Sequence, residues 1–577
     1  MSHKVSKTTP PLRRLIPITI VIGLSIAAVL VARWYSQVGA IDRAIASGLE
    51  LLSAAESPAD VQAALHRWEN ETRETWQSRR GPFLARVFAA HSLSDRRIPL
   101  LLKRLTGVDY GDRPEDWRRW YSTQARLREG LQPEIGARKR VKLKKRWSAP
   151  IGLSAWYTTI LPLDGNVYVG SLGRAIGDRV DNADGVVRVD GVTGHAELIF
   201  EPPGRGSRDI VGIAVGNGRL YVACRNGFLY CVSREGALLW EVSAGSAIVS
   251  APMSIDLNSN GVSDAVVATA RGEVVAISGS SGRTIWVSRG GRSASRLGRG
   301  GLVRVVLAAG DLLGGPEPEI LVASESGGVR VLAARTGRRL WQHDNQRLLR
   351  AGAAMVASAD MGIGPAFFGD DANTVWALSR SGDGLQAVPC WALSSSEAGG
   401  NVAGLRTLPA SGSGTAELLA CLSGRSGGRG GAICAIGRGG ERWRYAPGGA
   451  IRGTPALADL NDDGQIEIIV ASTSSRDERD ETGVVTIVSR DGHCLHRLAL
   501  DAAVECSPVI ADVDGDGKLE LLVADRSGRL HCFGTKGIGP VGWGMPGGDS
   551  HNTRNADNAY AFGQVPVGFQ WKWRPKY

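Results

Sequence analysis

The sequence predicts an all-β protein, an eight-bladed β-propeller of four-stranded antiparallel sheets, preceded by a transmembrane helix and a small α-helical region. Two observations predict the propeller. A unit of about 50 residues recurs from residue 147 onward, and each unit holds short apolar runs separated by glycine-containing turns. The chain also has 76 glycines in 577 residues without a Gly-X-Y period, which favours a turn-rich β protein over collagen.

Two markers define the repeat. An acidic loop recurs, most clearly as DLNSNGVSD (256–264), DLNDDGQIE (459–467) and DVDGDGKLE (512–520). A turn glycine before the last strand of each unit recurs at residues 194, 236, 282, 337, 384, 440, 492 and 537. Eight such turns predict eight sheets, and four-stranded sheets repeated around an axis form a propeller.

Tryptophans follow four of these glycines at three or four residues, namely Trp240, Trp286, Trp341 and Trp443. A large ring at a fixed place on an outer strand is expected to pack one sheet against the next. The propeller must also be closed. Either residues 142–149 supply the last outer strand of blade 8 from the N-terminal side, which we favour, or residues 537–543 supply it from the C-terminal side.

The N-terminal part predicts membrane attachment. Eighteen residues between Arg14 and Arg33 carry no charge, and as a helix they would span about 27 Å. Residues 1–14 are basic, so we expect a cytoplasmic tail, a transmembrane signal anchor at 15–33, and the bulk of the chain in the periplasm or outside the cell. A cleavable signal peptide ending near Ala40 is the alternative.

The remaining boundaries follow from composition. Residues 34–137 carry helical patterns and are expected to form a spacer, in which LTGVDYGDRPEDWRRWY (105–121) resembles segments of HEAT-like helical units. Residues 138–146 form a basic linker or closing strand, residues 147–543 the propeller, and residues 544–577 a C-terminal tail. Eight cysteines without a CxxC motif are expected to be buried thiols, although Cys224/Cys231, Cys421/Cys434 and Cys506/Cys532 could pair locally.

The net charge of +11 does not indicate a nucleic-acid-binding face. Residues 1–14 contribute four positive charges and residues 138–146 contribute seven, so the rest of the chain is neutral overall. We therefore expect no nucleic-acid partner.

The repeats resemble known families. VRVDGVTGHAEL (187–198) and VAISGSSGRTIW (275–286) resemble the PQQ-like propeller repeat, with its Asp-x-x-Thr-Gly turn followed by tryptophan. The loops at 459–467 and 512–520 resemble FG-GAP (VCBS) calcium loops, and GWGMPGGDSHNT (542–553) is similar to the tail of bacterial membrane-anchored propellers. These resemblances imply the fold but not one function, because such propellers include dehydrogenases, assembly factors and binding modules.

The acidic loops predict calcium sites. Oxygen ligands at alternate positions, with a glycine at the sharp turn, can converge on one hard cation. Asx turns without a metal are the alternative reading. The predicted ligands of two full sites, and of a weaker third, are Asp512, Asp514, Asp516, Glu520 and the carbonyl of Lys518; Asp459, Asn461, Asp463, Glu467 and the carbonyl of Gln465; and Asp256, Asn258, Asn260 and Asp264.

The sequence predicts a non-enzymatic binding or scaffolding module that engages a protein, peptide or glycan on a propeller face. No catalytic or cofactor-binding residue is predicted, because the HExxH and Walker motifs are missing. A PQQ-dependent quinoprotein dehydrogenase is the main alternative, and a glycan-directed enzyme is another. Resemblance to quinoprotein alcohol dehydrogenases would imply adjacent cysteines, which this sequence does not have, so a quinone cofactor is not expected.

Overall fold

The computed structural model describes residues 141–545 with gaps, the longest at 174–183, 291–304, 357–365, 394–400 and 409–416. It also describes residues 46–47, 50–51 and 67, all of them helical. The chain divides into two units, Met1–Gly130 and Leu131–Tyr577. The predicted span at 15–33, the rest of the helical spacer and the tail from residue 546 lie outside the described residues. Within the described part, no helix has the length and hydropathy needed to cross a bilayer.

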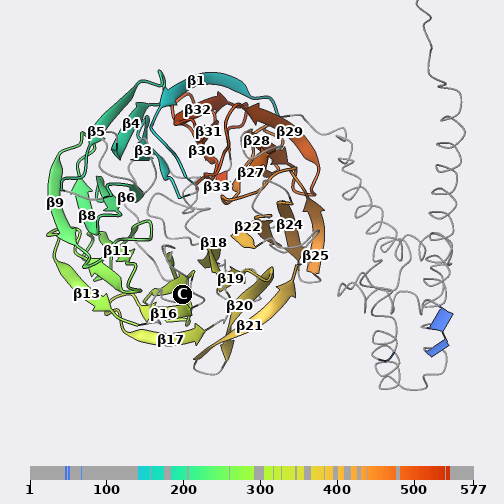
Figure 1. Ribbon diagram of the computed structural model, residues 1–577, viewed down its shortest axis with the longest axis horizontal. Helices are drawn as coiled ribbons and strands as arrows, with labels where there is room; N and C mark the ends of the chain where they lie inside the picture. Colours follow the sequence, from blue (N-terminus) through green and yellow to red (C-terminus); the bar gives the residue numbers. More distant parts are fainter. Residues whose placement is uncertain are drawn as a thin grey trace, which may run out of the picture. The chain divides into compact units, whose positions relative to one another are not determined.

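The second unit confirms the prediction of an eight-bladed propeller. Eight antiparallel sheets stand around a ring, seven with four strands and one with five (Figure 1). The outer strands β5, β9, β13, β17, β21, β25, β29 and β1 lie along the rim (Figure 1). The sheets are called blades 1–8 in chain order.

The first four blades follow one another from the inner to the outer strand. Blade 1 consists of β2 (Ile160–Leu163), β3 (Asn166–Leu172), β4 (Asp184–Asp190) and β5 (Ala196–Phe200). Blade 2 consists of β6 (Ile210–Gly216), β7 (Arg219–Cys224), β8 (Phe228–Val232) and β9 (Leu238–Ser243). Blade 3 consists of β10 (Met253–Ile255), β11 (Asp264–Ala268), β12 (Val274–Ile277) and β13 (Thr284–Ser288). Blade 4 consists of β14 (Val305–Gly310), β15 (Glu319–Ser324), β16 (Gly328–Ala333) and β17 (Arg339–Asp344).

The last four blades complete the ring. Blade 5 consists of β18 (Leu349–Val356), β19 (Ala366–Asp370), β20 (Thr374–Ser381) and β21 (Gly384–Ala392). Blade 6 consists of β22 (Val402–Leu408), β23 (Glu417–Leu422), β24 (Ala432–Gly437) and β25 (Gly440–Tyr445). Blade 7 consists of β26 (Ala456–Ala458), β27 (Glu467–Ser475), β28 (Glu481–Val488) and β29 (Cys494–Leu500), with β33 (Val541–Trp543) beside β26. Blade 8 consists of β30 (Val509–Ala511), β31 (Glu520–Ala524), β32 (Arg529–Gly534) and β1 (Lys144–Pro150).

The burial of the strands explains their apolar runs. Every residue of β6 is buried, because neighbouring blades cover both faces of an inner strand, whereas β9 on the rim alternates between exposed and half-buried residues. All eight outer strands also carry a β-bulge, in which one residue has no partner on the neighbouring strand. In order from blade 1, the bulge residues are Ile199, Leu239, Ile285, Leu340, Cys390, Arg442, Leu495 and Arg146.

The tryptophans that follow the bulge residues lie between blades, as expected. The indole Nε1 of Trp443 donates to the carbonyl of Arg490 in the next blade at 2.8 Å, and that of Trp286 donates to the carbonyl of Ala334 at 3.0 Å. Four of the rings, those of Trp147, Trp240, Trp286 and Trp443, lie on a turn glycine of the next blade. Gly337, for example, has a φ of +68°, and a Cβ there would overlap the ring of Trp286.

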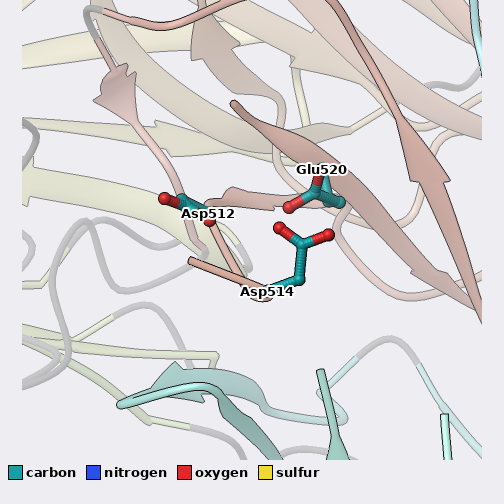
Figure 2. Close-up of side chains that lie close together, drawn as sticks. All are labelled: Asp512, Asp514 and Glu520. Carbon is teal, nitrogen blue, oxygen red and sulfur yellow. The ribbon is translucent and has the colours of Figure 1, made fainter. Parts of the chain in front are cut away.

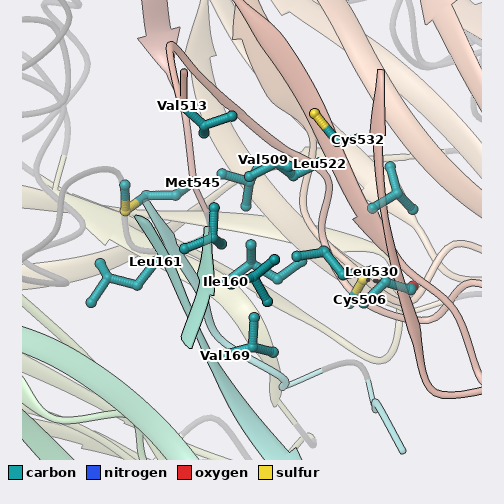
Figure 3. Close-up of a cluster of buried hydrophobic side chains, with 14 of the residues drawn as sticks. Ile160, Leu161, Val169, Cys506, Val509, Val513, Leu522, Leu530, Cys532 and Met545 are labelled. Carbon is teal, nitrogen blue, oxygen red and sulfur yellow. Dashed lines mark hydrogen bonds between the residues drawn. The ribbon is translucent and has the colours of Figure 1, made fainter. Parts of the chain in front are cut away.

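The ring is closed by β1, as we favoured. It pairs antiparallel with β32 as the outer strand of blade 8, while β33 joins blade 7 instead. Ile160, Leu161 and Val169 of blade 1 lie beside Val509 and Leu522 of blade 8 in one buried cluster (Figure 3). The expectation that Gly537 precedes an outer strand was wrong, because its turn follows β32 and leads towards β33.

All eight cysteines are free thiols, and only Cys390 is not buried. The local disulfides considered as the alternative are therefore not present.

Candidate functional site

The predicted calcium loops occupy one equivalent place in three blades. Each connects the inner strand to the second strand, at β10–β11, β26–β27 and β30–β31. The last predicted ligand of each loop, Asp264, Glu467 or Glu520, is the first residue of the second strand and is buried. The repeat therefore anchors the end of every loop in the blade while its tip faces solvent.

The loop of blade 8 brings three carboxylates together (Figure 2). One oxygen from each of Asp512, Asp514 and Glu520 lies within 4.8 Å of the others. Ca²⁺ binds oxygen ligands at 2.3–2.6 Å, so two ligands on opposite sides of one ion are about 5 Å apart. These three side chains therefore fit a calcium ion, and they form the one such group of acidic, histidine or cysteine side chains within the described residues.

The same loop is also a set of Asx-type turns. Asp512 accepts the N–H groups of Gly515 at 2.7 Å and of Gly517 at 3.0 Å. Asp516 accepts the N–H of Lys518 at 2.8 Å, and the ammonium of Lys518 lies 3.5 Å from the same carboxylate. These bonds shape the loop whether or not a metal is bound, so both readings of the sequence remain compatible with its backbone.

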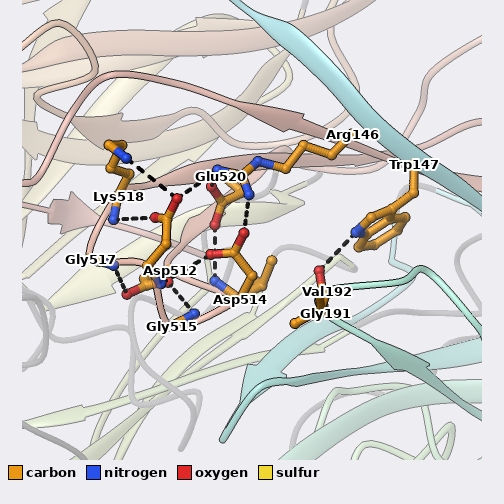
Figure 4. A network of polar contacts seen from close by, with 12 residues as sticks. Arg146, Trp147, Gly191, Val192, Asp512, Asp514, Gly515, Gly517, Lys518 and Glu520 are labelled. Carbon is orange, nitrogen blue, oxygen red and sulfur yellow. Dashed lines mark hydrogen bonds and ion pairs between the residues drawn. The ribbon is translucent and has the colours of Figure 1, made fainter.

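A cation of the protein itself lies among these carboxylates. The guanidinium of Arg146, from β1, contacts Asp514, lies 3.0 Å from Asp516 and lies 3.0 Å from Glu520 (Figure 4). The hydrogen bond from Arg146 is the main cause of the lowered pKa of Asp516. Burial raises the pKa of Glu520 to about 7, against the opposing effects of Arg146 and of the Val513 N–H.

The loop of blade 7 arranges its ligands differently. Asp459 is buried and accepts the N–H groups of Asp462 at 2.7 Å and Gly464 at 2.8 Å. The amide of Asn461 donates to Glu467 at 3.1 Å, and the N–H of Leu460 donates to the same carboxylate. The structure thus brings together three predicted ligands, Asp459, Asn461 and Glu467, while Asp463 and Gln465 lie exposed at the tip.

The loop of blade 3 has the least capacity for a metal. Both carboxylate oxygens of Asp264 accept backbone N–H groups, from Leu257 at 3.2 Å and Gly279 at 3.0 Å, and burial raises the pKa of Asp264. Asp256 accepts the N–H groups of Asn260 and Gly261. The remaining predicted ligands, Asn258 and Asn260, are exposed neutral side chains.

Sequence reasoning missed the arginines at these loops. In blade 6 the bulge residue Arg442 contacts Glu417, the first residue of β23, just as Arg146 contacts Glu520 in blade 8. The available signal was an arginine directly before the outer-strand tryptophan, in Arg146-Trp147 and Arg442-Trp443. Arg146 is the last residue of the basic run at 138–146, so the sequence alone assigned it to that run and not to the acidic loop.

The turn of blade 1 contains the Asp-x-x-Thr-Gly residues on which the PQQ-like resemblance rests. One carboxylate oxygen of Asp190 accepts the N–H and the hydroxyl of Thr193, each at 2.7 Å, and the N–H of Val192 at 3.2 Å. The bonds from Thr193 are the largest cause of the lowered pKa of Asp190. Gly194 then takes a φ of +73° beneath Trp147, so Asp, Thr and Gly each have a structural role in the turn.

Residues 183–382 match the family model PQQ_2, described as outer membrane protein assembly factor BamB. No curated protein matches the chain. Among solved structures, Sqt1 of Saccharomyces cerevisiae is 11% identical, covers 69% of this chain and 98% of its own, and has a TM-score of 0.46.

Two further structures are similar to the chain. BamB from Moraxella catarrhalis is 15% identical and covers 56% of this chain and 94% of its own, with a TM-score of 0.34. Quinohemoprotein alcohol dehydrogenase from Comamonas testosteroni is 14% identical and covers 68% of this chain and 76% of its own, with a TM-score of 0.43. The PQQ_2 match runs from β4 of blade 1 to β20 of blade 5, so this part of the propeller is similar to the PQQ-like family.

Proposed function

We propose that the chain is a non-enzymatic binding or scaffolding protein, exported and held at a membrane by residues 15–33, with calcium stabilising its acidic loops. The proposed partner is another protein, and an extended segment of it pairs with the outer strands of blades 2 and 3. The family match supports a protein-binding role, because the matched model is described as an assembly factor.

The observation that carries the proposal is an apolar rim on consecutive blades. Large apolar side chains on β5, β9 and β13 are 37–46% exposed, namely Leu198, Leu238, Leu239, Ile285 and Val287. Exposed apolar clusters of this kind mark interaction surfaces more often than isolated apolar residues do.

The backbone at this rim supports strand addition. β9 and β13 are the last strands of their sheets, and no other described strand pairs with their outer edges. An exposed strand edge offers N–H and C=O groups to an extended segment, and apolar side chains beside it add affinity. The two bulge residues Leu239 and Ile285 occupy equivalent positions, so one segment could meet the same contact on each blade.

Site-specific photo-crosslinking tests this surface. A photoreactive residue at position 239 or 285 of the full chain, expressed in its own cells, should give a defined protein adduct that mass spectrometry identifies. The matched control is position 499, because Ala499 is exposed on the outer strand β29 of blade 7. The partner, once purified, should bind the parent chain and lose affinity for an Ile285→Lys variant.

Equal adducts at positions 239 and 499, or unchanged affinity of the Ile285→Lys variant, would contradict the proposal. The enzymatic alternative has its own test. If the chain reduces a dye in the presence of quinone, calcium and an alcohol or sugar, it is a dehydrogenase, and the proposed non-enzymatic binding function is wrong.

A further inference from the structure

In two blades the bulge residue of the outer strand contacts the acidic first residue of the second strand. In blade 8 the guanidinium of Arg146 contacts Glu520, and in blade 6 that of Arg442 contacts Glu417. Both glutamates begin the second strand of their blade, and their side chains are 0% and 4% exposed. Two independent blades therefore place an arginine at one position against an equivalent buried carboxylate.

Other blades with an acidic residue at that place have a different bulge residue. It is Leu495 in blade 7, Leu340 in blade 4 and Ile285 in blade 3. An aliphatic side chain carries no charge, so in these blades the bulge cannot neutralise the loop. The difference matters most between blades 7 and 8, whose loops hold the two full sets of predicted calcium ligands.

We propose that the bulge residue decides how a loop of this propeller is neutralised, and that Arg146 is the built-in cation of the 512–520 loop. This inference rests on the calcium-binding part of the proposed function. Arg146 engages Asp514, Asp516 and Glu520, three of the four carboxylates predicted to bind the metal. A divalent cation must displace the guanidinium from these oxygens, because two cations repel each other at one set of ligands.

Two consequences follow. The 512–520 loop binds calcium more weakly than the 459–467 loop, although it has more carboxylates. Calcium that does bind at 512–520 also removes an attachment of β1, the strand that closes the ring (Figure 4).

The test is calcium titration calorimetry on the full chain in an Asp463→Asn background, which weakens the blade 7 site. In that background, Arg146→Gln should raise the calcium affinity of the 512–520 loop by about tenfold. Arg146→Lys keeps the positive charge and should raise it less.

Arg442→Gln is the matched control. It removes the arginine at the same position of blade 6, but the loop at 409–417 has a single carboxylate, Glu417, at the five alternate positions. This variant should leave calcium binding unchanged.

The two parts fail in distinguishable ways. If calcium binds the parent chain and Asp463→Asn weakens that binding, but Arg146→Gln changes nothing, the inference about Arg146 is overturned and the calcium proposal stands. If no variant binds calcium, both fall. Thermal unfolding followed by near-ultraviolet circular dichroism, once in chelator and once in calcium, provides a second readout. Calcium should raise the unfolding midpoint of the Asp463→Asn, Arg146→Gln double variant more than that of the Asp463→Asn variant.

Discussion

The indole of Trp147 donates its Nε1 hydrogen to the carbonyl oxygen of Gly191 at 2.8 Å, across the junction between blade 8 and blade 1. The preceding residue, Arg146, reaches the acidic loop of blade 8 (Figure 4). Two consecutive residues of β1 thus attach the closing strand in two directions. One attachment holds the strand to its own blade, and the other joins the last blade to the first.

The first prediction concerns this junction. Trp147→Phe keeps a ring but loses the hydrogen bond and should lower the free energy of unfolding by about 1 kcal/mol. Trp147→Ala also leaves a cavity beside Gly194 and should lower it by about 3–5 kcal/mol. Urea unfolding at pH 7 measures both. Trp240→Phe is the matched comparison, and its effect should be smaller because its bond to the Gly279 carbonyl is 3.4 Å long.

If Trp147→Phe and Trp240→Phe lower the free energy of unfolding equally, the hydrogen bond from Trp147 to Gly191 does not stabilise the junction more than the longer bond of Trp240 stabilises its own.

The propeller could be predicted from the sequence because its repeat is carried by local features. A turn such as Asp190–Gly194 sets its own geometry through bonds between near neighbours. In four blades a tryptophan follows the turn glycine after three or four residues. The closing strand was also foreseeable, since residues 142–149 resemble an outer strand that lacks a blade.

The contacts of the acidic loops could not be predicted in the same way. Arg146 lies 368 residues before Asp514 in the chain, and nothing local links them until the ring closes. Whether Asp264 points into the blade or towards the loop centre also depends on Gly279, which belongs to a different turn. Ligand spacing therefore identified candidate residues without showing which of them are already engaged.

The second prediction concerns Asp525, which organises the turn between β31 and β32. Its carboxylate accepts bonds from His531 at 2.8 Å and from the hydroxyl of Ser527 at 2.6 Å. Burial raises its pKa, but the bonds from His531 and Ser527 outweigh that effect, so the pKa of Asp525 lies below its ordinary value. Asp525→Asn should therefore lower the free energy of unfolding at pH 7 by about 2 kcal/mol.

The sign of the pH dependence follows from the lowered pKa. Stabilisation by an ionised Asp525 is fully present above the ordinary aspartate pKa and is lost as the pH falls through the lower pKa of the folded state. The deficit of Asp525→Asn should thus shrink when urea unfolding is repeated from pH 7 down to about pH 3. A deficit that stays constant over this range would show that the charge of Asp525 does not contribute.

The third prediction concerns the thiols. Burial raises the pKa of Cys224 and of Cys506 to about 12, so both are protonated and shielded from reagents at neutral pH. The native chain should react with Ellman's reagent at Cys390 at most, and the denatured chain at all eight cysteines. Fewer than eight thiols after denaturation without reductant would reveal a disulfide, and Cys390→Ser should remove any native reaction.

The last prediction concerns calcium at the 459–467 loop, where the bulge residue is Leu495 and Asp463 lies exposed at the tip. Because a ligand that binds the native state alone stabilises it, calcium at 100 times its dissociation constant should add about 2.7 kcal/mol to the free energy of unfolding. Asp463→Asn removes one predicted ligand and should weaken this response, which urea unfolding with calcium or chelator measures.

The neighbouring Asp462 supplies the control for that experiment. It is also exposed and takes a φ of +58°, a conformation that asparagine tolerates, so Asp462→Asn removes the same charge from the same loop without straining it. It stands between two predicted ligand positions and should keep the full calcium response. If both variants lose the calcium response equally, calcium acts through the general negative charge of the loop. If the parent chain itself shows no response at millimolar calcium, these loops are Asx turns without a metal.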